Sequence, residues 1–289
     1  MKKRIDIRKE IERLDPRADC KRIVFLTSYL EFPWDMTRAL ELALFRTFAV
    51  PTIAALLDKT GEFTGDTLRR YDDTAIIVNE IMINGYDSER GMSFIKRMNR
   101  IHGQYDISND DFLYTLSTFV FEPIRWINKF GWRSLYPNEE QALFYFWREV
   151  GLRMRIENIP ETFEAFEAFS RDYEAKTFAD TEAGRRVANS TRDLLLSFYL
   201  PKSLWKAAEP AVYALMDQPL LDAMGYPRPS DAARRRIEGL MRARAKLLRL
   251  LPKNKYPQMS TLLQYPTHPD GYSVDDIGPT SLREKWAKQ

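Results

Sequence analysis

The residues best suited to bind a metal in this chain of 289 residues are its two histidines and its single cysteine. His102 ends a helix-like segment and is followed by the acidic turn Ser108–Asp111. A neutral imidazole is a common metal ligand and is the proximal ligand of haem iron in globins and peroxidases. A histidine near a helix end is equally an ordinary polar residue. The neighbouring residues leave both interpretations open.

Three metal-centred arrangements are compatible with these ligands. The first is an iron site of two histidines and one carboxylate. Its ligands would be His102, His268 and either Asp106 or Asp270. The second is haem bound by the thiolate of Cys20, whose charged neighbours predict an exposed setting. The third is haem with neutral His102 as its proximal ligand.

Several other chemistries lack the residues that they require. The sequence contains no G-x-S-x-G nucleophile elbow, no phosphate-binding glycine loop and no dinucleotide fingerprint after a strand. No E-x-x-H motif is present, so a di-iron carboxylate bundle is not supported. Zinc sites of the usual kinds need more cysteine and histidine than this chain has.

Helices are expected to position these residues. Apolar spacing and helix start signals predict one helix from Ser88 or Glu89 to His102, and another from Gly65 to Gly85. Further helices are expected at 35–57 with a break at Pro51, 112–126, 141–154, 163–173, 182–200, 202–216 and 230–251. Strand signals are nearly absent. We therefore predict an all-α fold, with roughly eight to eleven helices in a single large domain that covers residues 1–289. Residues 1–22 would form an N-terminal extension and 253–289 an irregular C-terminal tail.

Composition limits the partners. The chain is 44% apolar and 29% charged, as expected of a folded globular protein, and its net charge of +3 gives no case for nucleic acid. Aromatic residues make up 13% of it, which suits either a large core or an apolar ligand pocket. The most apolar runs, Phe48–Leu57 and Phe112–Phe121, are about half as long as a membrane span. The charged start, Met1–Asp6, lacks the apolar core of a signal peptide. These features predict a cytoplasmic protein without a transmembrane segment.

A basic segment, Arg234–Arg249, stands out near the C-terminal end. Its charges are expected to form a solvated face opposite Ile237, Leu240, Met241 and Leu248. The alternative is peripheral contact with a membrane surface or docking to a partner.

Six further segments occur in a fixed order across most of the chain. They are Phe45–Pro51, Arg70–Thr74, Asn99–Tyr114, Gly131–Arg133, Phe146–Gly151 and Tyr265–Pro279. In this order they resemble the superfamily of haem-dependent oxygenases that contains the MpaB-like and the latex-clearing (rubber) oxygenases. The MpaB-like branch fits better.

The resemblance implies a mostly helical fold that encloses a b-type haem, with His102 as the proximal iron ligand. Arg70 and Thr74 correspond to a pair beside the haem in the rubber oxygenases. Two positions depart from that branch. Asp73 stands where a lysine can cap the iron, and Asp106 stands where an arginine follows the ligand histidine. These departures separate the chain from the distal-pocket chemistry and polyisoprene substrate of the rubber oxygenases.

Physical reasoning gives these residues candidate roles. Arg70 and Thr74 are four residues apart and therefore share a helix face. A guanidinium can pair with a haem propionate, and a hydroxyl can donate a hydrogen bond to bound dioxygen. Arg46 is a further candidate for a propionate partner. The alternatives are a solvent-facing Arg70 and a packing role for Thr74. Four aromatic residues are expected in the core rather than in a pocket: Phe112, Tyr114, Phe144 and Trp147.

Together these inferences predict an enzyme, a haem b-dependent oxygenase. It would use dioxygen, with an electron donor, to cleave or hydroxylate an apolar, isoprenoid- or lipid-like substrate. The alternative is a protein of the same fold without catalysis, either a haem sensor or carrier or a helical scaffold.

Overall fold

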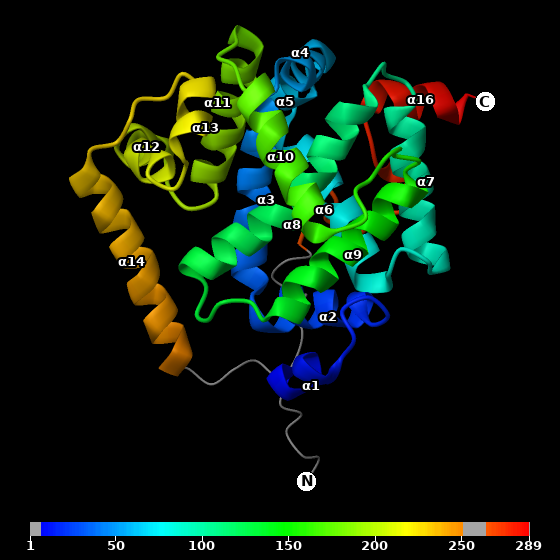
Figure 1. The fold of residues 1–289 in the computed structure, drawn as a ribbon. Helices are drawn as coiled ribbons and strands as arrows, with labels where there is room; N and C mark the ends of the chain where they lie inside the picture. Colours follow the sequence, from blue (N-terminus) through cyan, green and yellow to red (C-terminus); the bar gives the residue numbers. More distant parts are fainter. Residues whose placement is uncertain (1–6, 251–263, 289) are drawn as a thin grey trace.

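The computed structural model describes residues 7–250 and 264–288, which fold into helices joined by short connections (Figure 1). The N-terminal half holds α1 (Ile7–Arg13), α2 (Cys20–Leu26), η1 (Thr27–Glu31), α3 (Pro33–Phe48), α4 (Pro51–Thr60), α5 (Glu62–Gly65), α6 (Thr67–Asn84), α7 (Glu89–His102) and α8 (Asn109–Phe130). The C-terminal half holds α9 (Pro137–Arg153), α10 (Phe163–Thr177), α11 (Glu182–Ser197), η2 (Lys202–Leu204), α12 (Trp205–Tyr213), α13 (Gln218–Ala223), α14 (Asp231–Leu250), η3 (Val274–Asp276) and α16 (Thr280–Ala287).

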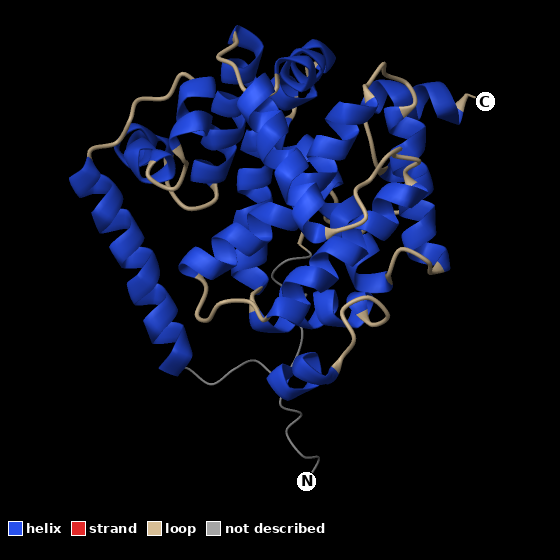
Figure 2. Cartoon of the chain, in the orientation of Figure 1, coloured by secondary structure: helices blue, strands red, loops and turns tan. Residues whose placement is uncertain are grey.

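The prediction of an all-α fold is confirmed. Figure 2 shows no strand in the described ranges, which form fifteen α-helices in one globular domain. Roughly eight to eleven were predicted, because elements as short as α5 and α13 carry too few apolar positions to show a helical period. The described part of the tail is not wholly irregular, since it ends in α16; its residues 253–263 and 289 lie outside the described ranges. At the other end, Ile11 and Cys20 of the expected extension are buried in the core.

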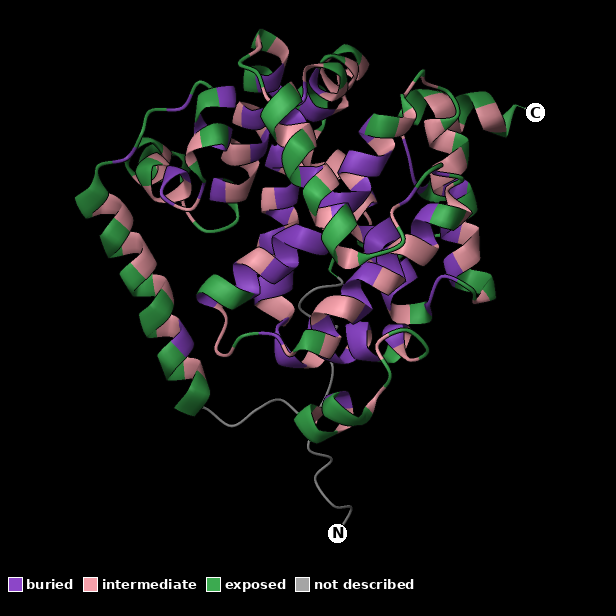
Figure 3. Cartoon of the chain, in the orientation of Figure 1, coloured by how far each residue is buried: buried purple, intermediate pink, exposed green. Residues whose placement is uncertain are grey.

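The central helix is α8, which packs against α3, α9 and α10 (Figure 1). Figure 3 shows the buried residues gathered around it. Ser108 caps this helix by accepting a hydrogen bond from the Asp111 N–H at 3.1 Å. Acidic residues in the first turn suit the helix dipole. The helix continues past Pro123 to Phe130, as its apolar run requires.

A hairpin of α6 and α7 carries the residues singled out above. Asp66 caps α6 and Ser88 caps α7, each by accepting a hydrogen bond from a backbone N–H three residues further on. The turn between the helices is tight. Gly85 has a φ of +84°, and a Cβ added to Gly91 would lie only 1.9 Å from the Gly85 carbonyl oxygen. The start of α6 and the end of α7 therefore lie at the same end of the hairpin.

The C-terminal segment 265–278 is fastened to this hairpin. Arg97 of α7 donates hydrogen bonds to the carbonyl oxygens of Ile277 at 2.8 Å and Asp275 at 2.7 Å. The Tyr272 hydroxyl donates to Glu80 of α6 at 2.7 Å. Residues more than 170 positions apart in the chain thus form one wall.

The basic helix α14 lies along one side of the molecule (Figure 1). Arg244 ties it to the start of α3 through an ion pair with Asp35 at 3.0 Å. The prediction that Leu240 faces the core is wrong, because this side chain is 67% exposed. The other three residues of the expected face are half-buried: Ile237, Met241 and Leu248. Peripheral contact of α14 with a membrane surface stays a prediction.

Among the described helices, none alone has both the length and the apolar character of a membrane span. The pair α3 and α4 reaches these criteria only when the two are taken together, and they are bent by 99° where they meet.

Candidate functional site

A cavity of about 500 Å³ lies between α3, α4, α6, α7, α8 and α9. The C-terminal segment completes its wall with Ile277, Gly278 and Pro279. This volume falls within the range of about 300–1,000 Å³ that cofactor and small-molecule sites occupy. Arg70, Thr74 and His102 all line it, so the fold brings together three of the residues that the sequence predicted.

His102 is the last residue of α7 and faces this cavity. Its ring centroid lies 5.3 Å from that of Phe112. The Nδ1 atom is enclosed and has no hydrogen-bond partner in the described part of the chain. Burial, followed by the nearby charge of Arg70, lowers the pKa of His102 to about 4. The imidazole is therefore neutral at pH 7, which is the form that binds metals.

Arg70 and Thr74 contact each other in the first turns of α6. The Arg70 guanidinium donates a hydrogen bond to Thr74 Oγ1, and the Thr74 hydroxyl donates to the Arg70 carbonyl oxygen at 3.0 Å. The guanidinium also lies 5.0 Å from the centroid of the Phe63 ring. Burial lowers the pKa of Arg70, and attraction to Asp73 and Glu62 opposes this only in part. Within the described ranges, Arg70 forms no ion pair with a carboxylate.

These features fit a haem. An enclosed polar atom without a partner calls for a ligand, and the neutral imidazole of His102 supplies one nitrogen donor to iron. A desolvated guanidinium without a carboxylate suits the anionic propionate of a haem. The remaining walls are largely aliphatic and aromatic, as the faces of a porphyrin require.

The four predicted core aromatics divide between core and cavity. Tyr114 and Phe144 are fully buried and lie outside the cavity wall. Phe112 and Trp147 belong to the packed interior and also line the cavity. The wall beside His102 is therefore aromatic.

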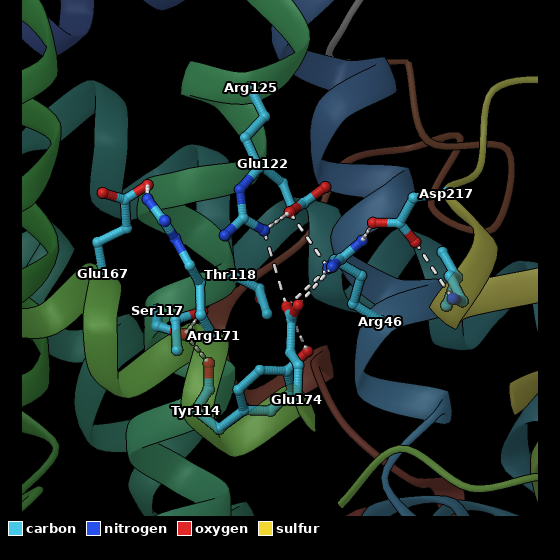
Figure 4. A network of polar contacts seen from close by, with 12 residues as sticks. Arg46, Tyr114, Ser117, Thr118, Glu122, Arg125, Glu167, Arg171, Glu174 and Asp217 are labelled. Atoms are coloured by element: carbon cyan, nitrogen blue, oxygen red, sulfur yellow. Dashed lines mark hydrogen bonds and ion pairs between the residues drawn. The ribbon is translucent and has the colours of Figure 1, made fainter. Parts of the chain in front are cut away.

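Arg46 is not brought to this site. Figure 4 shows its guanidinium between the carboxylates of Glu174 at 2.5 Å, Asp217 at 2.9 Å and Glu122 at 3.3 Å. Burial alone would lower the pKa of Arg46, but these three charges outweigh it and raise that pKa. Arg46 does not line the cavity. Its charge is already balanced, which leaves it no role as a propionate partner.

Neither alternative metal site forms. No three side chains of His, Cys, Asp or Glu in the described ranges are grouped so that they could share a metal ion. His268 instead lies 3.2 Å from Asp73. Cys20 is buried, with its sulfur 3.4 Å from the Tyr86 hydroxyl, and burial raises the pKa of its thiol. The expectation of an exposed Cys20 is wrong, and a protonated thiol outside the cavity cannot serve as a haem thiolate.

The sequence did not predict the structural role of two adjacent carboxylates of α6, Asp72 and Asp73. Asp73 accepts a hydrogen bond from the Gly278 N–H at 2.9 Å and contacts the His268 imidazole through its other oxygen. Asp72 accepts hydrogen bonds from the backbone N–H and the hydroxyl of Thr267 at 3.0 and 2.7 Å. Asp73 therefore holds the wall of the cavity from the position where the rubber oxygenases carry a lysine. The adjacent acids were a visible signal, but their partners lie about 200 residues away.

We expect Asp73→Lys to loosen the C-terminal segment. The new lysine is not expected to take the role that the lysine at this position has in the rubber oxygenases. The change removes the acceptor of the Gly278 N–H and places a cation beside His268. A hydrogen bond to a charged group contributes about 1.5–3 kcal/mol, so exchange of that amide should accelerate about tenfold or more. Hydrogen-exchange mass spectrometry of residues 265–278 measures this. Asp172→Lys, on the exposed surface of α10, makes the same charge change as a control. Unchanged amide protection of residues 265–278 in Asp73→Lys would show that Asp73 does not hold this segment in place.

Proteins of similar sequence are named as oxygenases. Residues 32–246 match the family described as ER-bound oxygenase mpaB/B'/Rubber oxygenase, catalytic domain. The ER-bound oxygenase mpaB' of Penicillium brevicompactum is 33% identical over 263 residues, which cover 84% of this chain and 62% of that protein. The ER-bound oxygenase mpaB of Penicillium roqueforti is 32% identical over 69% of this chain and 73% of that protein. The chain thus spans about three fifths of the length of the first relative. By this match across most of its length, the chain belongs to the mpaB/rubber oxygenase catalytic-domain family.

Proposed function

We propose that this chain is a haem b-dependent oxygenase that acts with dioxygen on an apolar substrate. One observation carries the proposal: among the described residues, His102 is a neutral imidazole without a hydrogen-bond partner at Nδ1, Arg70 is a guanidinium without a carboxylate partner, and both face the same apolar cavity. His102 would hold the iron, and Arg70 would pair with a propionate. Membership of an oxygenase family supports the reaction class.

When bound, haem supplies the redox chemistry with dioxygen. The chain's own residues prepare the site for it. His102 needs to release no proton before ligation, because its pKa is about 4. Thr74 is a positioning residue, since its hydroxyl proton is committed to the Arg70 carbonyl oxygen and its oxygen accepts from the Arg70 guanidinium. Donation from Thr74 to dioxygen in the cavity would require this hydroxyl to rotate away from the Arg70 carbonyl oxygen.

The walls orient the substrate and exclude water. Aliphatic and aromatic residues from α3, α4, α6, α8 and α9 make up most of the lining, so an isoprenoid- or lipid-like chain would bind there by burying apolar surface. A desolvated site also protects reactive species from water. An electron donor and a cytoplasmic location remain part of the proposal, although the relatives are named ER-bound.

The test is a visible spectrum of the freshly purified protein, followed by turnover. A Soret band that scales with protein concentration supports haem binding. Oxygen consumption with a reductant and a panel of terpenoids and lipids then supports oxygenase activity. Product masses separate hydroxylation, which adds one oxygen atom, from cleavage, which yields two carbonyl fragments. Haem without turnover on the panel would favour a sensor or carrier, and a protein that binds no added haem would leave a helical scaffold.

A further inference from the structure

A second polar site lies in the same cavity, at the contact between α3 and α6. Glu41 of α3 is only 6% exposed and lines the cavity. Its Oε1 accepts hydrogen bonds from the Tyr71 hydroxyl at 2.9 Å and from Arg38 at 2.6 Å. No residue in the described ranges donates to Oε2. One acceptor atom of a buried carboxylate therefore stays available to a ligand.

A carboxylate in an apolar wall is unfavourable unless something binds it. Burial raises the pKa of Glu41 to about 7, against the opposing effects of Arg38 and Tyr71. Arg38 does not line the cavity, because its guanidinium is held 5.5 Å from the ring centroids of both Trp34 and Tyr199. Above pH 7, Glu41 is thus the charged member of this group that faces the ligand space.

A second uncommitted group belongs to the same cavity. Ser28 of η1 is 2% exposed, and its Oγ has no hydrogen-bond partner in the described part of the chain. It lines the cavity together with Glu41 and Tyr71. By contrast, Asp73 also lines the cavity, but both of its oxygens are engaged by the C-terminal segment. No described residue pairs with Ser28 Oγ or with Oε2 of Glu41 in this wall, which is unusual for buried groups.

This polar wall is distinct from the His102 side. Arg70 and Thr74 are four residues apart and face one side of α6, whereas Tyr71 follows Arg70 and is turned by about 100° around the helix. Besides burial, the charge of Arg70 lowers the pKa of His102, while the Tyr71 hydroxyl donates a hydrogen bond to Glu41. A long ligand can therefore touch both sides of α6 with different parts of its length.

We propose that Glu41 anchors the polar end of the substrate, which is an elongated apolar molecule that ends in a hydroxyl group. The hydroxyl donates a hydrogen bond to Oε2 of Glu41, and the apolar remainder extends toward His102. Glu41 then determines which part of the chain reaches the His102 side of the cavity. This inference rests on the proposed function, since it assumes that the substrate occupies this cavity.

The test compares undecan-1-ol with its isomer decyl methyl ether, which has the same atoms but no hydroxyl donor. Isothermal titration of the purified full chain, at a pH above the Glu41 pKa of about 7, measures the affinity of each. We expect the alcohol to bind about tenfold tighter or more, because a hydrogen bond to a charged group contributes about 1.5–3 kcal/mol. In Glu41→Gln the amide oxygen takes over the contacts of Oε1 and presents an N–H₂ group, to which both ligands can be acceptors. The ratio of the affinity for the alcohol to the affinity for the ether should therefore fall toward one. Glu149→Gln, on the outer part of α9, is the matched control and should keep the wild-type ratio.

A wild-type ratio near one, or a ratio that survives Glu41→Gln, overturns the proposal. Glu41→Asp keeps the charge but shortens the side chain, and it serves as a second variant with the same expected fall. Because the two ligands are compared within each variant, a general loss of affinity cancels. A normal ratio in a protein that binds no haem would sink the oxygenase proposal and leave the anchor intact. A Soret band together with an affinity ratio near one would support the haem proposal and overturn the role of Glu41 as the anchor.

Discussion

Replacing His102 with alanine should lower haem affinity by about 100-fold or more, because loss of even a supporting residue around a metal ligand costs 10–100-fold. The fold should persist, since the described residues donate no hydrogen bond to His102 Nδ1 and accept none from it. Titration of the apoprotein with haem, followed at the Soret band, measures the loss, and circular dichroism measures the helix content. An unchanged Soret band at full occupancy would show that His102 is not the ligand.

Two further variants sharpen this experiment. His102→Gly leaves room for a free imidazole, so millimolar imidazole should restore part of the Soret band if ligation is the role of His102. His268→Ala removes the other histidine, whose partner is Asp73, and should retain haem. If imidazole restores the Soret band of His102→Gly, and His268→Ala keeps its haem, then His102 is the iron ligand. This assignment needs no measurement of catalytic activity.

Arg46→Met should be the most destabilising of the changes considered, by about 3–5 kcal/mol, without a selective loss of haem. The substitution removes the cation that Glu122, Glu174 and Asp217 share, and the first two of these carboxylates are largely buried. Arg125 still contacts Glu122 at 2.6 Å, so the lower end of that range is expected. Urea unfolding measures the free energy of unfolding, and the haem titration is repeated on the folded variant.

The control for Arg46→Met separates a buried cation from an exposed one. Arg186 also bridges two carboxylates, Asp58 and Glu182, but it does so at the surface, and Arg186→Met should have a much smaller effect. In Arg46→Met/Glu174→Gln, part of the lost stability should return, because one unbalanced charge is removed with its partner. Normal stability of Arg46→Met with impaired haem binding would instead place Arg46 at the haem.

The candidate site could be predicted from sequence where local rules decide it. The hairpin of α6 and α7 follows from cap residues and two glycines, and it brings Arg70 and His102 to one end. Arg46 could not be assigned in this way. Its partners Glu174 and Asp217 lie 128 and 171 positions away, and no spacing rule reports such a pairing.

Cys20 illustrates a second limit. Its charged neighbours in sequence suggested exposure, but adjacent residues of a helix point about 100° apart and say little about one another's surroundings. Leu240 shows the opposite case, since it fits the apolar face of an amphipathic helix that is only partly covered. Glu41 lay in an unremarkable helical stretch, and only the packing of α3 on the cavity revealed its free oxygen.

The helix α6 serves two structures at once, because Arg70 and Thr74 line the cavity while Asp72 and Asp73 accept hydrogen bonds from Thr267 and Gly278. Two events that order the same helix are thermodynamically coupled, and the coupling is reciprocal. We therefore expect a molecule that fills the cavity to strengthen the attachment of the C-terminal segment, and release of that segment to weaken the binding of the molecule. If this coupling holds, amide exchange in residues 267–278 would report whether the cavity is occupied.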